Sequence, residues 1–329
     1  MANVDVGVVI IGRNEGDRLK RCVRSLARYE CSMVYVDSGS TDDSVSFVLG
    51  EGFDVVELDM TTPFSAARAR NEGYRYLIQK YPCIDFIQFV DGDCEVCADW
   101  IFLARDHLLQ NESVASVCGR RKERYPESSI YNQLCDIEWN TPVGVAQATG
   151  GDFLCRKQAL IDVKGFDPQV IAGEEPEMCF RMRQQGWEIE RLDADMTWHD
   201  AAMTSLSQMY KRYERSGHAY AQGFSMHGSS EERYYRADVQ RIVLWACVIP
   251  VWILLIMCFL GGASVLLLLV YPLKIVQIFM REVKGREVRV ALAYASSLVL
   301  GKFPQFVGMM SFYIKRFLGR QFQIIEYKR

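Results

Sequence analysis

The sequence has no overall surplus of positive charge, because its formal net charge is −3 over 329 residues. The two parts of the chain differ, however. Before Lys211, 21 basic residues stand against 34 acidic ones, and from Lys211 onward 17 stand against 7. An acidic first part joined to a basic, apolar last part is not the profile of a nucleic-acid-binding protein. It fits a soluble domain tethered to an anionic membrane surface.

The 11 cysteines lack the regular spacing of a disulfide framework, and their number is odd. We therefore expect reduced thiols, as in a cytosolic compartment. Cys94 and Cys97 have CxxC spacing, but no second pair completes a zinc site, so we interpret both as ordinary buried thiols. A basic leader followed by an apolar run is also absent from the first residues, and no secretory signal is expected.

Charged residues are missing from 32 consecutive positions, residues 242–273. At about 1.5 Å per residue, one helix of that length would exceed the ~30 Å hydrocarbon core of a membrane. Gly261 and Gly262 near the middle predict a transmembrane helical hairpin over residues 242–280. Basic residues flank both outer ends and none lies in the turn, which predicts that both ends face the cytoplasm.

The segments on either side of this hairpin are expected at the membrane surface. Residues 206–241 are predicted to form an amphipathic or interfacial connector. Residues 290–314 are apolar but are interrupted by Lys302 and Pro304. This pattern predicts interfacial or re-entrant helices and a basic tail over residues 281–329, rather than a third full span.

The first ninety residues alternate short apolar runs with helical patterns. The apolar runs that predict strands are residues 4–11, 33–36, 54–58 and 85–90. Helical spacing between them predicts an α/β fold with a mostly parallel sheet covered on both faces. Binding sites on such sheets lie beyond the carboxyl ends of the strands. Asp37, Asp91 and Asp93 all follow such ends, and this convergence predicts a binding site there.

Asp91 and Asp93 flank Gly92 where an apolar strand ends. Side chains two positions apart on an extended chain point to the same side, and glycine lets a ligand approach the backbone. Carboxylate oxygens suit Mg²⁺ or Mn²⁺, which keep open positions for substrate phosphates. Such triplets also occur in surface turns. Asp37 could accept hydrogen bonds from a base or ribose, or form an Asx turn, and the sequence leaves both open.

Six motifs in order along residues 4–200 resemble those of family 2 glycosyltransferases. They are VVIIGRNE (8–15), VDSGSTD (36–42), ARNEG (69–73), FVDGD (89–93), GGDFL (150–154) and GEEPE (173–177). The resemblance implies a GT-A fold, a Rossmann-like nucleotide-binding domain, over residues 1–205. It also implies that a sugar is transferred from a nucleotide diphosphate sugar to a hydroxyl with inversion. Asp152 departs from the family, whose GGN-type loop commonly has Asn.

The resemblance also implies roles for individual residues. Six positions would bind the donor: Asn14, Glu15, Asp37, Arg70, Asp91 and Gly151. Three would hold Mg²⁺ or Mn²⁺: Asp91, Asp93 and His199. Glu175 takes the place of the general base, where the family commonly has Asp, and Glu174 is the alternative. Both glutamates could also complement the dipole of the helix that follows, and His199 could be structural.

These residue types suit glycosyl transfer. The acceptor hydroxyl is a poor nucleophile at neutral pH and needs a carboxylate base, while a cation stabilises the charge gathering on the leaving diphosphate. The expected partners are a nucleotide diphosphate sugar, a saccharide or lipid-linked acceptor and membrane lipids, without nucleic acid. The resemblance to bacterial membrane-associated members of the family implies a multi-pass or monotopic protein of the cell inner membrane. Its catalytic domain would be cytoplasmic and would act in polysaccharide or lipid-linked saccharide biosynthesis.

Two other functions remain open. Sugar-phosphate nucleotidyltransferases share the nucleotide-binding half of this fold, but they usually have a Gly-rich loop with Arg and Lys after the first strand, which residues 12–15 lack. A non-catalytic membrane scaffold would not need two carboxylate sites at the edge of its sheet. The basic residues Arg120, Arg121, Lys122 and Arg124 are interpreted as a solvated loop, with an acceptor or phosphate surface as the alternative.

Overall fold

The computed structural model describes residues 5–260 and 262–320, and the chain divides into two compact units. Unit 1 comprises Met1–Tyr125 and Cys135–Ala201, and unit 2 comprises Pro126–Leu134 and Ala202–Arg329. Every residue predicted to bind donor, metal or acceptor belongs to unit 1. The long apolar segments belong to unit 2.

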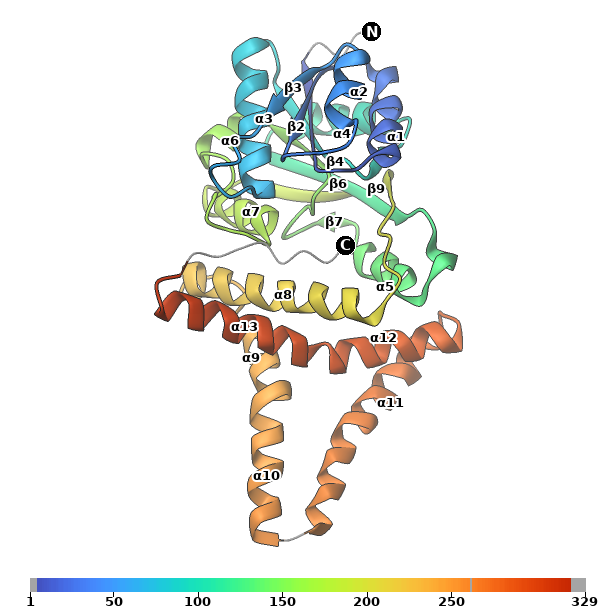
Figure 1. The fold of residues 1–329 in the computed structure, drawn as a ribbon, viewed down its shortest axis with the longest axis vertical. Coiled ribbons are helices and arrows are strands. Elements are labelled where there is room, and N and C mark those ends of the chain that lie inside the picture. Colours follow the sequence, from blue (N-terminus) through green and yellow to red (C-terminus); the bar gives the residue numbers. More distant parts are fainter. Residues whose placement is uncertain (1–4, 261, 321–329) are drawn as a thin grey trace. The chain divides into compact units, whose positions relative to one another are not determined.

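Unit 1 is an α/β domain built on one sheet (Figure 1). Its first strands are parallel, in the order β3 (Asp54–Glu57), β2 (Ser32–Asp37), β1 (Val6–Gly12) and β4 (Phe86–Asp91). The sheet continues through β8 (Phe153–Arg156), β6 (Val114–Glu123), β9 (Glu188–His199) and β5 (Cys94–Val96), and β7 (Gly144–Val145) pairs with β9. The predicted α/β fold is confirmed. The sheet is mixed beyond β4, because the alternation of strand and crossover helix ends there.

The helices that follow these strands pack their apolar sides on the sheet. They are α1 (Asp17–Leu26), α2 (Ser44–Gly50), α3 (Ala66–Lys80), α4 (Trp100–Gln110), α6 (Lys157–Asp162) and α7 (Glu174–Gln184), with the 3₁₀ turn η1 (Ala27–Tyr29) after α1. A second 3₁₀ turn, η2 (Pro126–Ser128), belongs to unit 2. α5 (Ile130–Trp139) spans the sequence boundary of the two units. Gly73 lets α3 lie close to the sheet, because a Cβ there would come within 2.4 Å of Val9.

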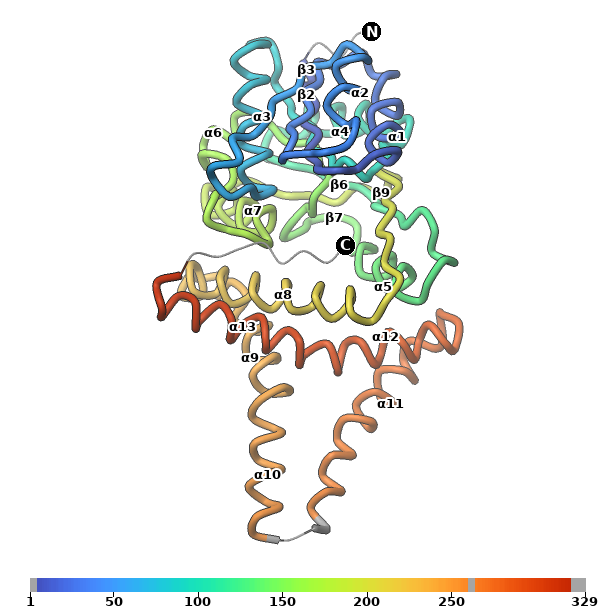
Figure 2. The backbone as a smooth tube through the Cα atoms, in the orientation of Figure 1, coloured from blue at the N-terminus to red at the C-terminus, as the bar shows by residue number. Residues whose placement is uncertain are grey.

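In the described part of unit 2 the regular elements are helical. They are α8 (Leu206–His227), α9 (Arg236–Val243), the π-helical turn η3 (Leu244–Val248), α10 (Ile249–Leu260), the 3₁₀ segment η4 (Gly262–Leu269), α11 (Val270–Glu282), α12 (Val288–Leu300) and α13 (Lys302–Phe317). α10 and α11 extend as a hairpin, whereas α8 and α13 lie side by side across its base (Figures 1 and 2).

Two glycines bring the backbones of α8 and α13 into contact. A Cβ on Gly217 would come within 1.9 Å of the carbonyl oxygen of Gln305, and a Cβ on Gly308 within 1.9 Å of that of Glu214. The rings of His218 and Phe312 meet edge to face in the same interface, 5.3 Å apart. A larger residue at either glycine would force the helices apart.

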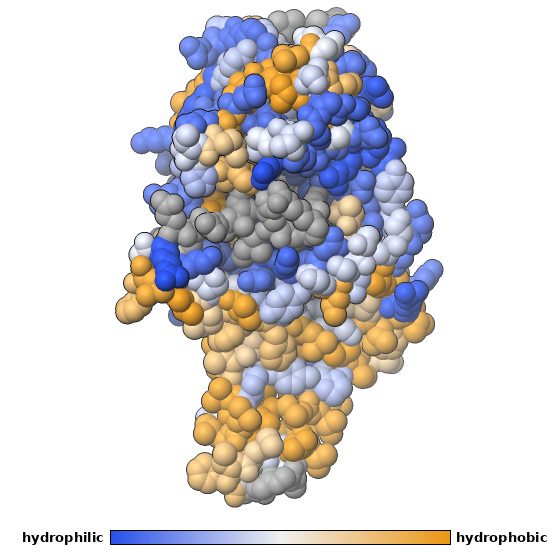
Figure 3. Space-filling view, in the orientation of Figure 1, coloured by the Kyte–Doolittle hydropathy of each residue, from blue (hydrophilic) through white to orange (hydrophobic). Residues whose placement is uncertain are grey.

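Among the described residues of unit 2, three helices are long and apolar enough to cross a membrane: Arg236–Phe259, Ser264–Glu282 and Val288–Phe317. Hydrophobic residues cover the hairpin of α10 and α11 (Figure 3). Phe259 is 83% exposed and Trp252 61%. Side chains of that size are seldom left in water in such a continuous surface. The length and the apolar composition of these helices confirm the predicted C-terminal membrane helices.

Candidate functional site

Arg70 of α3 joins the end of β4 to the start of α7. Its side chain is 2% exposed. Nη1 lies 2.9 Å from Glu174 Oε1 and 2.9 Å from Glu175 Oε1, and Nη2 donates to Asp91 Oδ1 at 2.8 Å. Three carboxylates, one from the end of β4 and two from the start of α7, therefore share one guanidinium. We refer to Arg70, Asp91, Glu174 and Glu175 as the carboxylate cluster.

Arg121 of β6 contacts the other oxygen of Asp91. Its Nη2 lies 3.1 Å from Asp91 Oδ2 and 2.7 Å from Asp152 Oδ2, and its Nε donates to Asp152 Oδ2. Asp152 is fully buried and also accepts hydrogen bonds from the Asp91 amide at 2.9 Å and from the Thr197 hydroxyl at 2.8 Å. This network fixes the orientation of Asp91.

Sequence reasoning missed Arg121. The interpretation of the basic residues as a solvated loop is wrong, because β6 extends through Glu123 and their charges are paired. Arg120 binds Asp136, and Lys122 binds Asp195. The feature of the sequence that could have indicated the role of Arg121 is Asp152, which stands in place of Asn. An additional buried carboxylate needs a cation nearby.

Gly151 lies directly against the carboxylate cluster. A Cβ at this position would come within 2.5 Å of Asp91 Oδ2 and 2.9 Å of Arg121 Nη2. Its carbonyl oxygen is 3.4 Å from Arg70 Nη2. A larger residue here would push against the Asp91 carboxylate and the Arg121 guanidinium, so the predicted donor-binding position borders both.

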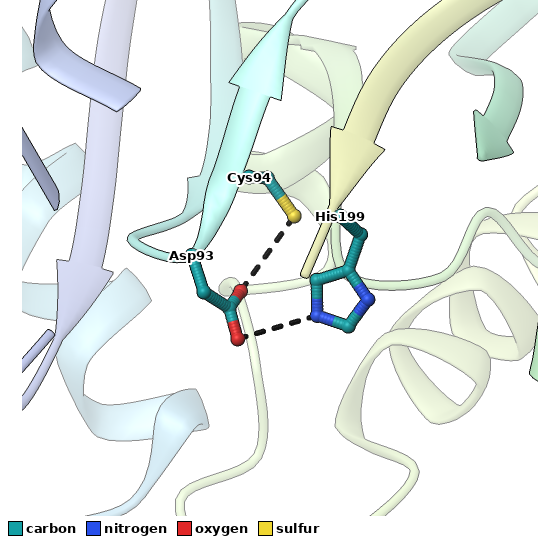
Figure 4. A group of neighbouring side chains, drawn as sticks. All are labelled: Asp93, Cys94 and His199. Atoms are coloured by element: carbon teal, nitrogen blue, oxygen red, sulfur yellow. Dashed lines mark hydrogen bonds and ion pairs between the residues drawn. The ribbon is translucent and has the colours of Figure 1, made fainter. Parts of the chain in front are cut away.

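Asp93 and His199 form a second group at the neighbouring strand ends (Figure 4). His199 Nε2 lies 3.2 Å from Asp93 Oδ2, and the Cys94 thiol donates to Asp93 Oδ1 at 3.7 Å. The ligand atoms of these three residues lie within 4.8 Å of one another. Burial raises the pKa of the Cys94 thiol well above its ordinary value, which favours the protonated form. The carboxylate and the imidazole are therefore the pair that fits a cation such as Mn²⁺.

Cys97, the other half of the CxxC pair, is only partly buried, so the prediction of two buried thiols is wrong for it. Cys94 is fully buried as predicted, and both keep free thiols. Cys97 precedes α4 and accepts a hydrogen bond through its carbonyl oxygen from the Tyr29 hydroxyl.

The loops after β1 and β2 hold the remaining predicted donor residues. Asp37 accepts hydrogen bonds from the amides of Gly39 at 2.9 Å and Ser40 at 2.8 Å, so the Asx-turn interpretation describes its contacts in this structure. Asn14 Oδ1 accepts from the Thr41 amide at 2.7 Å, which ties the two loops together. Glu15 forms an ion pair with Arg18 at 2.8 Å. A Cβ on Gly92 would lie 3.3 Å from Glu15 Cγ, so this loop borders the turn from Asp91 to Asp93.

Asp91 and Glu175 have opposite electrostatic environments. Burial disfavours the charged form of both carboxyls, but its effect prevails only at Glu175. For Asp91, Arg70 and Arg121 outweigh burial and hold its pKa below the ordinary value. For Glu175, burial outweighs Arg70 and, helped by the charges of Glu174 and Asp91, raises the pKa to about 7. Two neighbouring carboxyls whose pKa values are shifted in opposite directions are typical of acid–base sites.

Glu175 is also the more accessible of the two adjacent glutamates. Its side chain is 13% exposed, and that of Glu174 is 4% exposed. α7 begins at Glu174 after Gly173, whose φ of 78° fits glycine. Both glutamates lie in the first turn of α7, where negative charge is favourable. The structure therefore supports the dipole interpretation and leaves Glu175 able to meet a ligand.

Residues 7–165 match the protein-family model described as Glycosyl transferase family 2. Over these residues the chain is similar to family 2 glycosyltransferases. The resemblance seen in the motifs is thereby confirmed. Arg70, Asp91, Asp93 and Arg121 lie within the matched region, whereas Glu174, Glu175 and His199 follow it.

The fold of this chain is similar to that of solved structures, among them the following two. Mannosyltransferase PcManGT from Pyrobaculum calidifontis, in complex with GDP-Man and Mn²⁺, has a TM-score of 0.55 at 15% identity, and the match covers 95% of this chain and 86% of that one. S. aureus TarS 1–349 has a TM-score of 0.53 at 14% identity, with 90% and 92% covered. The predicted GT-A fold is confirmed by this similarity.

A curated relative is the pre-mycofactocin glycosyltransferase of Mycobacterium tuberculosis. It is 28% identical over 210 residues, which cover 60% of this chain and 43% of the relative. The match thus spans less than half the length of that relative.

Proposed function

We propose that this chain transfers a sugar from a nucleotide diphosphate sugar to a hydroxyl acceptor, with inversion and with Mg²⁺ or Mn²⁺. The observation that carries the proposal is the carboxylate cluster. One buried guanidinium, that of Arg70, holds both the carboxylate that ends β4 and the pair that begins α7. The family match and the GDP-Man and Mn²⁺ complex of PcManGT support the donor class and the cation.

Glu175 is the proposed base. As the acceptor oxygen attacks the anomeric carbon, its proton passes to Glu175 and the bond to the diphosphate breaks. A single displacement from the face opposite the leaving group inverts the configuration. Glu174, which is more buried and hydrogen-bonded to Arg70, would position the guanidinium rather than meet the acceptor.

The donor residues are proposed to act in two groups. Asn14, Glu15 and Asp37 shape the loops for the nucleoside, and Gly151 allows the diphosphate to approach the carboxylate cluster. Arg70 is almost fully buried and bound to three carboxylates, so we expect it to orient Asp91 more than to contact phosphate. A divalent cation held by Asp93, Asp91 and His199 would stabilise the negative charge on the departing diphosphate.

The test of the function is nucleotide diphosphate release from a panel of nucleotide diphosphate sugars by detergent-purified, full-length protein. A glycosyltransferase releases the diphosphate, by transfer or by slow hydrolysis. A nucleotidyltransferase would instead release pyrophosphate from a nucleoside triphosphate and a sugar phosphate. A scaffold would release neither. The assay therefore separates the proposed function from both alternatives.

Removal of divalent cations should abolish transfer, and Mn²⁺ or Mg²⁺ should restore it, because Asp93 and His199 offer a carboxylate and an imidazole within 3.2 Å. Asp93→Ala should weaken donor binding as well as turnover, since cation and diphosphate bind together. Donor titration and the transfer assay measure both effects. Asp85→Ala, on an exposed carboxylate just before β4, is the matched control. Full transfer in excess chelator would refute the cation site.

We further propose that α10 and α11 cross the membrane while α8, α12 and α13 lie in its interface. α8 carries Lys211, Arg212, Glu214 and Arg215, and such a helix is costly to place in hydrocarbon. The backbone contacts of Gly217 and Gly308 keep α13 against α8. The outer side of α13 exposes an apolar stripe at helical spacing: Val307, Met310, Ile314 and Phe317. One apolar side facing lipid is typical of an in-plane helix.

With two crossings, tags at the two ends of the chain should lie on the same side of the membrane, which we propose is the cytoplasmic side of the inner membrane. Three crossings would place them on opposite sides. Accessibility of both tags to an impermeant reagent, in intact cells and in inverted vesicles, measures this. The protein should also stay in the membrane fraction at high salt, because apolar burial is insensitive to screening.

A further inference from the structure

One indole ring contacts the partners of both carboxylates in the turn from Asp91 to Asp93. Trp139 is the last residue of α5, and its ring lies edge to face with the His199 ring, 4.6 Å away, and 5.7 Å from the Arg121 guanidinium. His199 Nε2 in turn lies 3.2 Å from Asp93 Oδ2. Arg121 Nη2 lies 3.1 Å from Asp91 Oδ2. Trp139 is therefore one side chain away from each carboxylate that is proposed to hold the cation.

The two contacts of Trp139 restrain their neighbours by different interactions. In an edge-to-face pair the positive edge of one ring meets the negative face of the other, so the pair restricts the rotation of both rings. Trp139 can thereby keep His199 Nε2 directed toward Asp93. A guanidinium within about 6 Å of an aromatic centroid is attracted by the ring. The same indole therefore also restrains Arg121, whose Nη2 contacts Asp91.

Asp136, one turn earlier on α5, fixes the position of the indole. Its Oδ1 accepts a hydrogen bond from the Glu123 amide at 2.8 Å, and its Oδ2 lies 2.7 Å from Arg120 Nη2. Residues three apart on a helix are neighbours on one face, so Asp136 and Trp139 both face β6. Since its neighbours there include an imidazole and a guanidinium, the half-buried indole is placed to orient polar groups as well as to pack.

We propose that Trp139 is a positioning residue of the cation site. Through His199 it aligns Asp93. Through Arg121 it aligns Asp91, so that both carboxylates face one divalent cation. This proposal rests on the cation site of the proposed function. It requires that loss of the ring weakens cation binding although no ligand atom is removed. Residues that orient metal ligands typically change metal affinity by about 10- to 100-fold when they are replaced.

Mn²⁺ binding to detergent-purified, full-length protein tests the proposal without turnover. Electron paramagnetic resonance measures free Mn²⁺ during a titration of the metal alone, and again with UDP or GDP added. Trp139→Leu should weaken Mn²⁺ binding about tenfold, because leucine fills the space without a ring. Trp139→Phe should keep most of the affinity, because a ring remains. Asp93→Ala should bind Mn²⁺ most weakly of all.

Trp187→Leu is the matched control, because it makes the same substitution elsewhere in unit 1. Trp187 is also partly buried, but its indole Nε1 donates to Asp162 Oδ2 at 3.1 Å. This variant should bind Mn²⁺ as the unmodified protein does. Turnover adds a second measurement: Trp139→Leu should raise the KM for Mn²⁺ about tenfold, and its kcat should recover at saturating Mn²⁺ because every ligand remains. A loss of kcat with unchanged Mn²⁺ affinity would contradict a positioning role.

The same measurements separate this proposal from the proposed function. If Trp139→Leu binds Mn²⁺ as tightly as Trp139→Phe, the ring does not position the site and the proposal is wrong, while the proposed function stands. If the variants differ as expected but no nucleotide sugar releases its diphosphate, Trp139 positions a cation site and the proposed function fails. If Asp93→Ala binds Mn²⁺ as well as the unmodified protein does, the cation site is wrong and this proposal fails with it.

Discussion

Replacing Glu175 with Gln should lower turnover by about 10²- to 10⁴-fold while leaving donor affinity nearly unchanged, because that is the usual contribution of a general base. Gln is nearly isosteric, and its Oε1 can still lie against the Arg70 guanidinium, which is 2.9 Å from Glu175 Oε1 in the structure. The start of α7 should therefore keep its geometry. A transfer assay measures turnover, and nucleotide-sugar titration measures donor affinity.

Glu174→Gln is the matched control, on the neighbouring residue and the same guanidinium. Glu174 is more buried than Glu175, so its loss should disturb Arg70 but not remove the proton acceptor. Its effect on turnover should be the smaller of the two. Normal turnover in Glu175→Gln with a dead Glu174→Gln would move the base to Glu174. Normal turnover in both would contradict glycosyl transfer by this site.

The pH dependence of kcat/KM is a second test of the role of Glu175. Burial raises the pKa of Glu175 to about 7, and only the deprotonated form can take a proton from the acceptor. The value of kcat/KM should therefore rise with pH, about tenfold per unit well below pH 7, and level off above it. Glu175→Gln should lose this rise. An unchanged pH profile in the variant would mean that another group controls it.

The fold could be predicted from the sequence as far as β4. Strands β1, β2 and β4 are buried on both faces, so they are continuous apolar runs, and α1 buries Leu19, Cys22, Val23 and Leu26 at the predicted spacing. β6 could not be predicted in the same way. Its second half, Gly119 to Glu123, is mostly charged and is a strand only because β9 pairs with it and acidic groups such as Asp136 and Asp195 neutralise it.

The candidate site was predictable in its members but not in its connections. The order of motifs pointed to Arg70, Asp91, Glu174 and Glu175. Of these, Arg70 and Glu174 are hydrogen-bonded although they lie 104 residues apart in the sequence. The contact of the Arg70 guanidinium with all three carboxylates depends on how α3 packs against α7. The hydrophobic periodicity of the sequence does not encode this packing. Arg121 was missed for the same reason.

Replacing Arg121 with Met should destabilise unit 1 by about 3–5 kcal/mol, the usual cost of leaving one partner of a buried ion pair uncompensated. Asp152 is fully buried and loses both of its contacts with this guanidinium. Thermal and denaturant unfolding of the full-length protein measure the change. Lys122→Met on the same strand is the control. Its ion pair with Asp195 is half-exposed, so it should cost only about 0–1 kcal/mol.

Adding Asp152→Asn to Arg121→Met should recover most of that loss. Asn is neutral, its side-chain oxygen can still accept the hydrogen bond from the Asp91 amide, and it is the residue that the family commonly has here. The buried carboxylate would then explain why this chain carries an arginine at 121. A double variant no more stable than Arg121→Met would mean that Arg121 acts mainly through its contacts with Asp91 and the Trp139 ring, since both are lost in both proteins.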